Sequence, residues 1–234
     1  MSIEDQFKVS ILLPTYNSEK YIKQTLDSIV KQVYKNYELV IIDNCSTDKT
    51  IEIINNYNNK IKIKVFIKKT KNLAEALNMG LDNSHGDFIA RIDSDDLIRK
   101  KRLLKQVEFL KNNSDYNLVG TNAIRFKKIK FFFKPFLIDY ENIFLKISMI
   151  FHSPFIHPTM MFRKKFIIEN KIRYDTNYNE CEDYKLWYDI SNLTKFKNLK
   201  YYGIFYRVHP LSASFKKKEK LNIYFKKINK FILE

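Results

Sequence analysis

The sequence of 234 residues contains few of the residues that mark special architectures. Its two cysteines are too few for a disulfide scaffold, and neither lies in a CxxC pair that would indicate zinc. Four glycines and five prolines leave room for no low-complexity linker, and no repeat is visible. No run approaches the roughly 20 apolar residues of a transmembrane helix, and residues 1–10 lack the apolar core of a signal peptide. We therefore expect a cytoplasmic protein built on one large domain.

The composition excludes disorder and favours an anionic partner. Hydrophobic residues make up 45% and aromatic residues 15%, and the formal net charge is +16. No zinc finger, RNP-like motif or basic recognition helix is visible, so we expect no nucleic acid. An anionic membrane surface, contacted from the inner face, fits better. Part of the positive charge reflects the abundance of lysine throughout the chain.

Two basic segments carry this membrane hypothesis. Residues 126–138 interleave lysines with phenylalanines, and residues 216–234 repeat apolar residues at helical spacing among lysines. Such mixtures are typical of segments that rest on anionic headgroups. The alternative is that both apolar faces pack on the domain while the lysines are solvated, and the sequence leaves the two about even.

The first half of the chain alternates strands with helices. Strands are predicted over 8–13, 37–42, 61–67 and 88–92. Helices are predicted after Asn17 or Ser18, which would cap the first, and over 51–57 and 73–81. This alternation predicts an α/β fold, with a wound, mostly parallel sheet and helices on both faces.

Polar clusters follow three of these strands. They are Pro14 to Asn17, Asp43 to Asp48, and Asp93 to Asp96. Because parallel strands bind ligands at their carboxyl ends, we expect the three clusters to meet at one rim. Clustered carboxylates there suit Mn²⁺ or Mg²⁺, which bridge acidic residues to the phosphates of a nucleotide. An acidic loop that caps a following helix is the alternative.

Six motifs occur in an order that resembles family 2 glycosyltransferases. They are Pro14-Thr15-Tyr16-Asn17, Asp43 to Asp48, Ala76 to Leu81, Gly86 to Asp96, His157 to Arg163, and Glu182 to Trp187. The series spans most of the chain. The resemblance implies a GT-A fold and transfer of a sugar from a nucleotide-sugar donor, a UDP-sugar in our reading, with inversion at the anomeric carbon.

The resemblance also implies roles on the donor side. Thr15, Tyr16 and Asp43 would line the base pocket, with Pro14, Asn17, Asn44, Lys71 and Ser94 among the other nucleotide-binding residues. Asp95 is the expected metal ligand, and Asp93 would contact the ribose or the metal shell. Each has a structural alternative: Pro14 could end a strand, Asp43 could cap a helix, and Tyr16 could be a core aromatic residue.

Glu182 and Asp183 are the candidates for the catalytic base. An inverting displacement needs one carboxylate at the acceptor hydroxyl. The resemblance implies Asp183 for that role and Glu182 as a neighbour in the acceptor site, since adjacent helical positions point about 100° apart. An acidic helix N-terminus is the alternative, and both readings can hold together.

Further candidates come from the second half of the chain. The stretch that contains Arg207 and His209 resembles a basic loop that closes over the diphosphate, with Arg207 as a phosphate clamp and His209 as a candidate metal ligand. His157 and Trp187 are predicted to bind the acceptor. A lone histidine beside apolar residues is more often structural. Relatives carry Asn-x-Gly-Leu where this chain has Thr70-Lys71-Asn72-Leu73, and Asn72 could replace the glycine in a left-handed turn.

The sequence therefore predicts a metal-assisted glycosyltransferase acting on a saccharide or lipid-linked acceptor. The expected domain covers 1–215, with a nucleotide-sugar part in 1–119 and an acceptor part in 120–215, followed by a basic helix in 216–234. A nucleotidyltransferase competes, although Pro14-Thr15-Tyr16-Asn17 contains none of the glycines of a phosphate loop. A non-catalytic membrane or nucleic-acid binding module is the third possibility.

Overall fold

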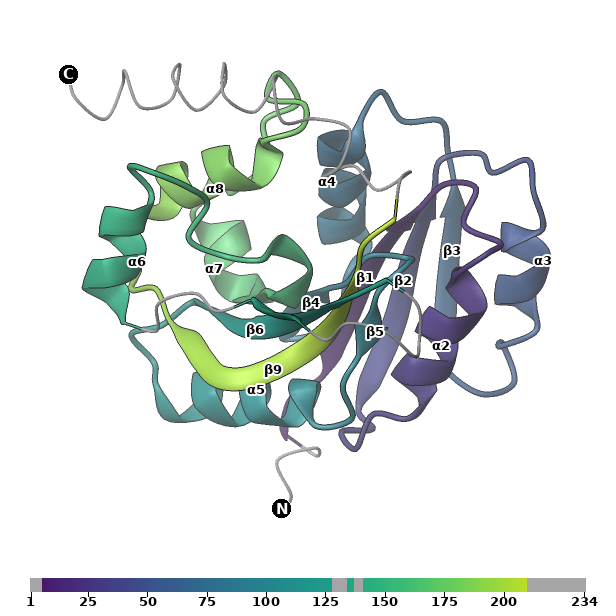
Figure 1. The fold of residues 1–234 in the computed structure, drawn as a ribbon, viewed down its shortest axis with the longest axis horizontal. Coiled ribbons are helices and arrows are strands. Elements are labelled where there is room, and N and C mark those ends of the chain that lie inside the picture. The colour runs from purple at the N-terminus through teal and green to yellow at the C-terminus, as the bar shows by residue number, and fades with distance from the viewer. Residues whose placement is uncertain (1–5, 128–133, 137–140, 210–234) are drawn as a thin grey trace.

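The computed structural model describes residues 6–127, 134–136 and 141–209, and for 134–136 only the backbone. A nine-stranded sheet runs through this part of the chain in the order β3-β2-β1-β4-β8-β6-β9-β5, with β7 paired to β6 (Figure 1). The strands are β1 (Val9–Thr15), β2 (Tyr37–Asp43), β3 (Ile63–Ile67), β4 (Phe88–Arg91), β5 (Leu97–Ile98), β6 (Leu118–Phe126), β7 (Lys134–Phe136), β8 (Met161–Arg163) and β9 (Asn198–Arg207).

The four strands predicted from the sequence form the parallel half of the sheet. β1 pairs in parallel with both β2 and β4, and β2 pairs in parallel with β3. β1 and β2 are buried almost throughout, as continuous apolar runs require when helices cover both faces. The remaining strands form a mixed half, in which β4 pairs antiparallel with β8 and β6 pairs in parallel with β9.

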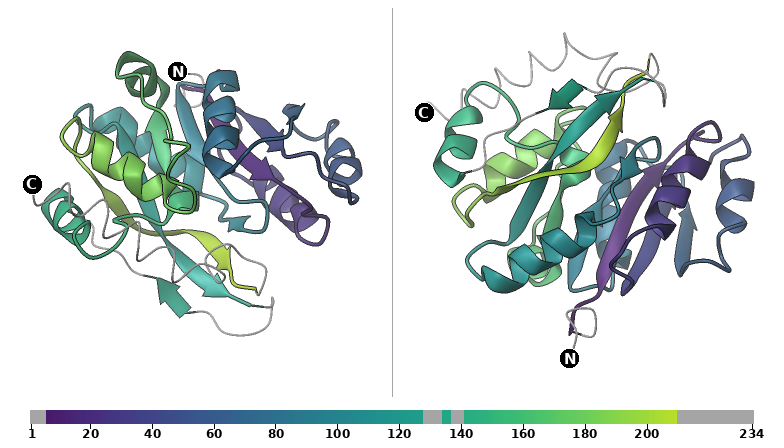
Figure 2. Two further views of the ribbon diagram at one scale, coloured as in Figure 1. Left: turned by 90° about the horizontal axis from the view of Figure 1, so that it is seen from above. Right: turned by 60° about the horizontal axis from the view of Figure 1, so that its bottom comes forward.

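Helices cover both faces of the parallel half. α4 (Leu73–Asn83) lies on one face of β1 and β2, and α2 (Ile22–Val30) lies on the opposite face with α3 (Thr50–Asn55) against it (Figure 2). The other helices are α5 (Arg102–Asn112), α6 (Asn142–Ser148), α7 (Lys164–Glu169), α8 (Glu182–Ile190) and the short 3-10 helix η1 (His157–Thr159). Within the described residues, no helix combines the length and apolar character needed to span a bilayer.

Two local predictions were wrong. α2 begins at Ile22 with Tyr21 as its N-cap residue and no side-chain cap, so neither Asn17 nor Ser18 caps it. Asn72 is extended, with φ −159°, and is the N-cap of α4, where its side chain accepts from the backbone N–H of Glu75. It therefore takes no left-handed conformation, and a capping interaction explains its presence better.

The mixed half joins the predicted acceptor part to the donor part in one sheet. β6 begins at Leu118, close to the predicted division at residue 119, and pairs with β8 and β9. The division into parts stays a prediction. The predicted basic helix in 216–234 and most of the 126–138 segment lie outside the described residues.

Candidate active site

The three polar clusters predicted from the sequence meet at one rim of the sheet. Thr15 and Asp43 are register partners at the ends of β1 and β2, and the N–H of Asn44 donates to the carbonyl of Thr15 at 2.9 Å. The loop after β1 also reaches the loop after β4, where the hydroxyls of Ser18 and Ser94 lie 2.8 Å apart. Parallel pairing of β1 with β2 and β4 brings these loops together, as the strand pattern predicts.

The loop after β2 forms a polar wall at this rim, held together by hydrogen bonds. Asp43 is fully buried, and its two carboxylate oxygens accept from the N–H of Ser46 at 2.8 Å and from its hydroxyl at 2.5 Å. Asn44 Oδ1 accepts from the N–H of Thr70 at 2.7 Å, which ties this loop to the start of α4. These hydrogen bonds fix the orientation of the Asp43 side chain at the rim.

Tyr16 and Asn17 are the exposed members of this wall. The Tyr16 ring is 57% exposed, so it is not a core aromatic residue and is free to stack on a planar ligand. Asn17 is left-handed, with φ 45°, and its side-chain oxygen accepts from the N–H of Thr47 at 2.8 Å. Pro14 lies in β1 and is the register partner of Ile42 in β2, and Lys71 is exposed. The nucleotide roles of these residues stay predictions.

Three carboxylates after β4 form a cluster that suits a cation. Asp93, Asp95 and Asp96 each offer an oxygen within 4.8 Å of the others. Asp96 is only 1% exposed, and its Oδ2 has no hydrogen-bond partner among the described residues. Burial and the neighbouring carboxylates raise the pKa of Asp96 well above its usual value, because ionising all three places like charges side by side. A divalent ion would relieve that repulsion, so the oxygen donors fit Mn²⁺ or Mg²⁺.

Arg91 is a functional candidate that the sequence analysis missed. It is 3% exposed at the end of β4, and its guanidinium pairs with both oxygens of Asp93, at 2.9 and 2.6 Å. The same cation lowers the pKa of Asp183 by electrostatic attraction, although burial has the larger effect and raises it overall. Arg91 therefore joins the acidic loop to the candidate base.

A second buried arginine supports the strand that carries Arg91. Arg102 is fully buried on α5 and donates to the carbonyls of Arg91 at 2.8 Å and of Pro158 at 2.8 Å. It thereby fixes the end of β4 against the turn of η1. The signal in the sequence that could have found Arg91 was a charged residue inside the apolar run 88–92.

Arg207 and His209 contact the acidic loop from the far end of the chain. Arg207 is the last residue of β9 and is 5% exposed. Its backbone N–H donates to Asp96 Oδ1 at 2.8 Å, and its Nε donates to the carbonyl of Asp95 at 2.6 Å. The guanidinium lies between the rings of Tyr21 and Phe126. These contacts make Arg207 a support of the acidic loop and count against the phosphate-clamp role, which stays a prediction.

His209 lies beside the predicted metal ligand. Its Nε2 is 2.8 Å from Asp95 Oδ2, and both side chains are partly exposed. A histidine and a carboxylate placed side by side can share one divalent ion. The predicted metal role of His209 therefore agrees with its position, but it remains a prediction.

The candidate base lies at the N-terminus of α8. Glu182 and Asp183 open this helix, and both are acidic residues in its first turn. Glu182 is buried, whereas Asp183 is half-buried. Burial raises the pKa of Asp183 despite hydrogen bonds from backbone N–H groups and from the Ser153 side chain. A carboxylate with a raised pKa is a stronger proton acceptor, as general-base catalysis requires.

His157 and Trp187 are buried and do not border an open surface. Nε2 of His157 is 2.9 Å from the Tyr174 hydroxyl, and burial lowers the pKa of His157 well below its usual value, so the ring is neutral. Trp187 is fully buried and stacks on Phe162 with ring centroids 5.9 Å apart. The predicted acceptor contacts of both residues stay predictions, and this burial counts against a direct contact by Trp187.

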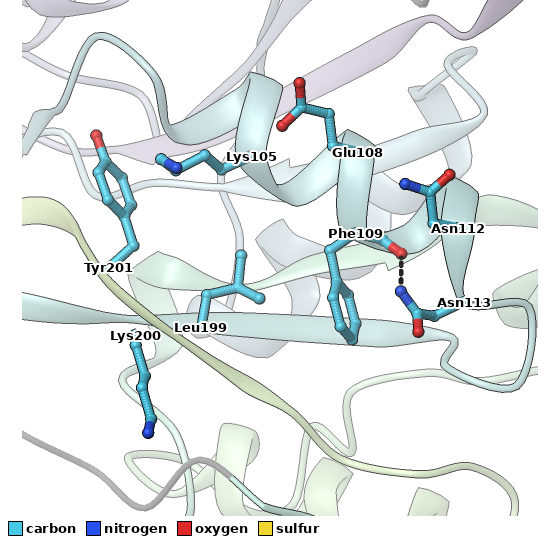
Figure 3. A pocket seen from close by; sticks show the side chains of 8 residues that line it. All are labelled: Lys105, Glu108, Phe109, Asn112, Asn113, Leu199, Lys200 and Tyr201. Atoms are coloured by element: carbon cyan, nitrogen blue, oxygen red, sulfur yellow. Dashed lines mark hydrogen bonds between the residues drawn. The ribbon is translucent and has the colours of Figure 1, made fainter.

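A separate pocket lies on α5 and β9, away from the carboxylates. Figure 3 shows the side chains that line it, which come from both elements. Its volume is about 370 Å³. Its lining residues are Lys105, Glu108, Phe109, Asn112, Asn113, Leu199, Lys200 and Tyr201. None of them was predicted to act in the site, and none belongs to the six motifs.

Comparison with known structures identifies the fold. The structure of residues 1–349 of TarS from S. aureus in complex with UDP aligns with a TM-score of 0.72 and 26% identity, over 87% of this chain and 61% of that one. A mixed sheet with a parallel half and a carboxylate-bearing loop after its fourth strand is thus the GT-A glycosyltransferase fold. The predicted fold class is confirmed.

The family follows from sequence comparison. The model for glycosyl transferase family 2 matches residues 10–171, and the chain belongs to that family. An uncharacterized glycosyltransferase of Methanocaldococcus jannaschii, MJ1057, is 32% identical over 219 residues, covering 87% of this chain and 72% of the relative. Poly(ribitol-phosphate) beta-N-acetylglucosaminyltransferase TarS of Staphylococcus aureus is 31% identical over 182 residues, covering 75% of this chain but 31% of TarS. The chain is a glycosyltransferase, and several relatives are considerably longer.

Proposed function

We propose that this protein transfers a sugar from a UDP-sugar to a hydroxyl of a saccharide or lipid-linked acceptor, with inversion at the anomeric carbon. The observation that carries the proposal is the convergence of Asp93, Asp95 and Asp96 with Asp183 near the buried guanidinium of Arg91. The nearby wall of Thr15, Tyr16 and Asp43 offers a donor-nucleotide site on the same rim. TarS, a relative, has been solved with UDP-GlcNAc, which supports UDP as the nucleotide.

In this proposal, Asp93, Asp95 and Asp96 would hold Mn²⁺ or Mg²⁺, assisted by His209. A bound divalent ion neutralises charge on the diphosphate as it leaves. Tyr16 stacks on the base, and Asp43 accepts from a base N–H. Arg91 orients Asp93 through two hydrogen bonds, and Arg207 fixes the backbone of the acidic loop.

Asp183 acts on the acceptor side. Its carboxylate accepts the proton of the acceptor hydroxyl while the hydroxyl oxygen attacks the anomeric carbon. The bond from that carbon to the diphosphate oxygen breaks on the opposite face, which inverts the configuration. The raised pKa of Asp183 favours this proton transfer, and Ser153 orients the carboxylate.

Nucleotide titration tests the donor half of the proposal. UDP should bind the full chain with an affinity that rises at least tenfold on addition of Mn²⁺, whereas ADP should show a smaller gain. A nucleotidyltransferase would prefer a nucleoside triphosphate, and a basic binding module would show no metal-dependent preference. Either result would contradict the proposal. A screen of UDP-sugars for slow hydrolysis then identifies the donor.

A peripheral position at the inner face of the membrane is part of the proposal. The net charge of +16 supports it, as does the mixture of lysine and phenylalanine in residues 126–138.

A further inference from the structure

α6 and the turn after it form an exposed apolar surface. Of the ten large hydrophobic side chains that are exposed in the described part of the chain, five lie between residues 143 and 151. Four of them define what we call the α6 face: Ile143 (59% exposed), Phe144 (56%), Ile147 (48%) and Phe151 (75%). Single exposed hydrophobic residues are ordinary, but a contiguous group of this kind marks an interaction site.

The exposure follows from the spacing of the residues. At about 100° per residue, positions 143, 144, 147 and 151 fall on one side of a helix, and Leu145 and Met149 fall on the other. Leu145 and Met149 are buried in the core. The segment is therefore apolar on both sides, and among the described residues only one side packs against the domain.

This face is attached to the candidate base. The hydroxyl of Tyr184 on α8 donates to the carbonyl of Met149, and the side chain of Ser153 hydrogen-bonds Asp183. Only one residue separates Phe151 from Ser153. A surface bound to the α6 face would thus lie next to the N-terminal end of α8, on the acceptor side of the site.

The charge of the chain indicates that the surface bound by the α6 face is anionic. Between Phe126 and Phe151 the sequence has five lysines and two acidic residues, and the whole chain carries +16. Exposed phenylalanine and isoleucine within a lysine-rich stretch of the sequence suit the boundary between headgroups and acyl chains of a bilayer, where rings insert and cations remain at the headgroups.

We propose that the α6 face docks on a bilayer containing anionic lipid, and that it presents Asp183 to acceptors anchored in that bilayer. The docking stands independently of the enzymatic activity, while the presentation of a lipid-linked acceptor rests on the proposed function.

Vesicle binding tests the docking without any nucleotide. The full chain is sedimented with vesicles of phosphatidylcholine alone and with vesicles in which phosphatidylglycerol replaces part of it. The wild type should bind the anionic vesicles, and the double variant Phe144→Ser/Phe151→Ser should bind at least about tenfold more weakly, because each ring contributes apolar area.

The matched control removes apolar side chains of similar exposure elsewhere. Ile168 is 60% exposed and Leu193 is 50% exposed. Ile168→Ser/Leu193→Ser should bind vesicles like the wild type. Metal-dependent UDP affinity should be equal in all three proteins, which checks the fold of each. Vesicle binding without UDP binding would uphold the docking and refute the proposed function.

Three outcomes would overturn the inference. The first is equal vesicle binding by the α6-face variant and the wild type, or no binding by either. The second is a dimeric wild type and a monomeric variant in the absence of lipid, which would assign the face to a second copy of the chain. The third is a loss of thermal stability confined to the α6-face variant with unchanged vesicle binding, which would indicate that another part of the chain covers the face.

Discussion

At the scale of single residues, the site depends on the buried guanidinium of Arg91 among several acidic side chains. Arg91 pairs with Asp93 through two hydrogen bonds and also attracts Asp183, Glu182 and Asp96. A buried charge without such partners costs several kcal/mol, so the acids and the arginine stabilise one another. Arg91 thus sets the charge of the cluster before any ligand binds.

The first prediction concerns Asp95. Asp95→Ala should abolish the gain in UDP affinity that Mn²⁺ gives, because the diphosphate loses its counter-charge, and leave the metal-independent affinity largely intact. Calorimetry with and without Mn²⁺ measures both. Asp115→Ala, at a partly exposed carboxylate paired with Lys195 outside the site, is the control and should behave like the wild type. Unchanged metal dependence in Asp95→Ala would remove this residue from the metal site.

The second prediction concerns Asp183. Asp183→Asn keeps the shape of the side chain and loses its basicity, so turnover should fall by about two to four orders of magnitude while donor affinity stays within a few-fold. Steady-state kinetics and UDP titration separate the two effects. Asp189→Asn, at an exposed carboxylate on the same helix, should keep turnover within a few-fold. Near wild-type transfer by Asp183→Asn would move the role of base to Glu182 or to another residue.

At the scale of elements, strands with continuous apolar runs were predictable and short strands were not. β1, β2 and β4 lie within one or two residues of their predicted ranges, since a buried parallel strand is apolar at every position. β5 and β8 have two and three residues, too few to show a period. Their pairing depends on partners more than 40 residues away, which local pattern cannot encode.

The same limit explains the site residues that were missed. Asp93, Asp95 and Asp183 stood out because carboxylates followed a strand or opened a helix. Arg102 was overlooked because its bonding partners lie on other elements, and Arg91 because its attraction to Glu182 and Asp183 depends on a distant helix. Asn72 was misjudged because a local capping interaction with Glu75 explains it, while its side-chain amide also donates to the carbonyl of Thr176.

The third prediction concerns β2. Glu38 is fully buried and accepts from Lys8 at 2.7 Å, from Ser10 at 2.8 Å and from the N–H of His85 at 2.9 Å. Burial opposes ionisation, but these donors outweigh it and lower the pKa of Glu38 to about 2. Glu38→Gln should therefore lower the free energy of unfolding at neutral pH by about 3 kcal/mol.

The pH dependence of this loss has a definite sign. A lowered pKa stabilises the fold above the unfolded-state value of 4.5, and the contribution is lost as pH falls toward 2. Urea unfolding should therefore show a smaller difference between wild type and Glu38→Gln near about pH 3.5 than at about pH 7. The control is Glu108→Gln, at an exposed carboxylate on α5, which should change little at either pH. A difference that stays constant with pH would mean that Glu38 is not the ionised acceptor in the folded protein.

At the scale of the whole molecule, the fourth prediction concerns the basic C-terminal segment. If the lysines in 216–234 contact an anionic surface, each contributes on the order of 1 kcal/mol, and salt screens that attraction. A chain that ends at residue 215 should lose the salt-sensitive part of its binding to phosphatidylglycerol vesicles while keeping its UDP affinity. Equal binding by both chains across a salt series would show that the segment contributes nothing to membrane attraction.

The bonds from Arg207 to the acidic loop have a consequence for synthesis of the chain. The backbone N–H of Arg207 donates to Asp96, which lies 111 positions earlier in the chain, and its side chain donates to the carbonyl of Asp95, 112 positions earlier. The end of β9 therefore helps to define the acidic loop. A nascent chain whose ribosome has translated only the first 200 residues has all the acids of the site but not the strand end that orders them. Metal and nucleotide are then expected to bind late, after β9 has emerged. Under the proposed function, an unfinished or prematurely terminated polypeptide would consequently not sequester nucleotide sugar.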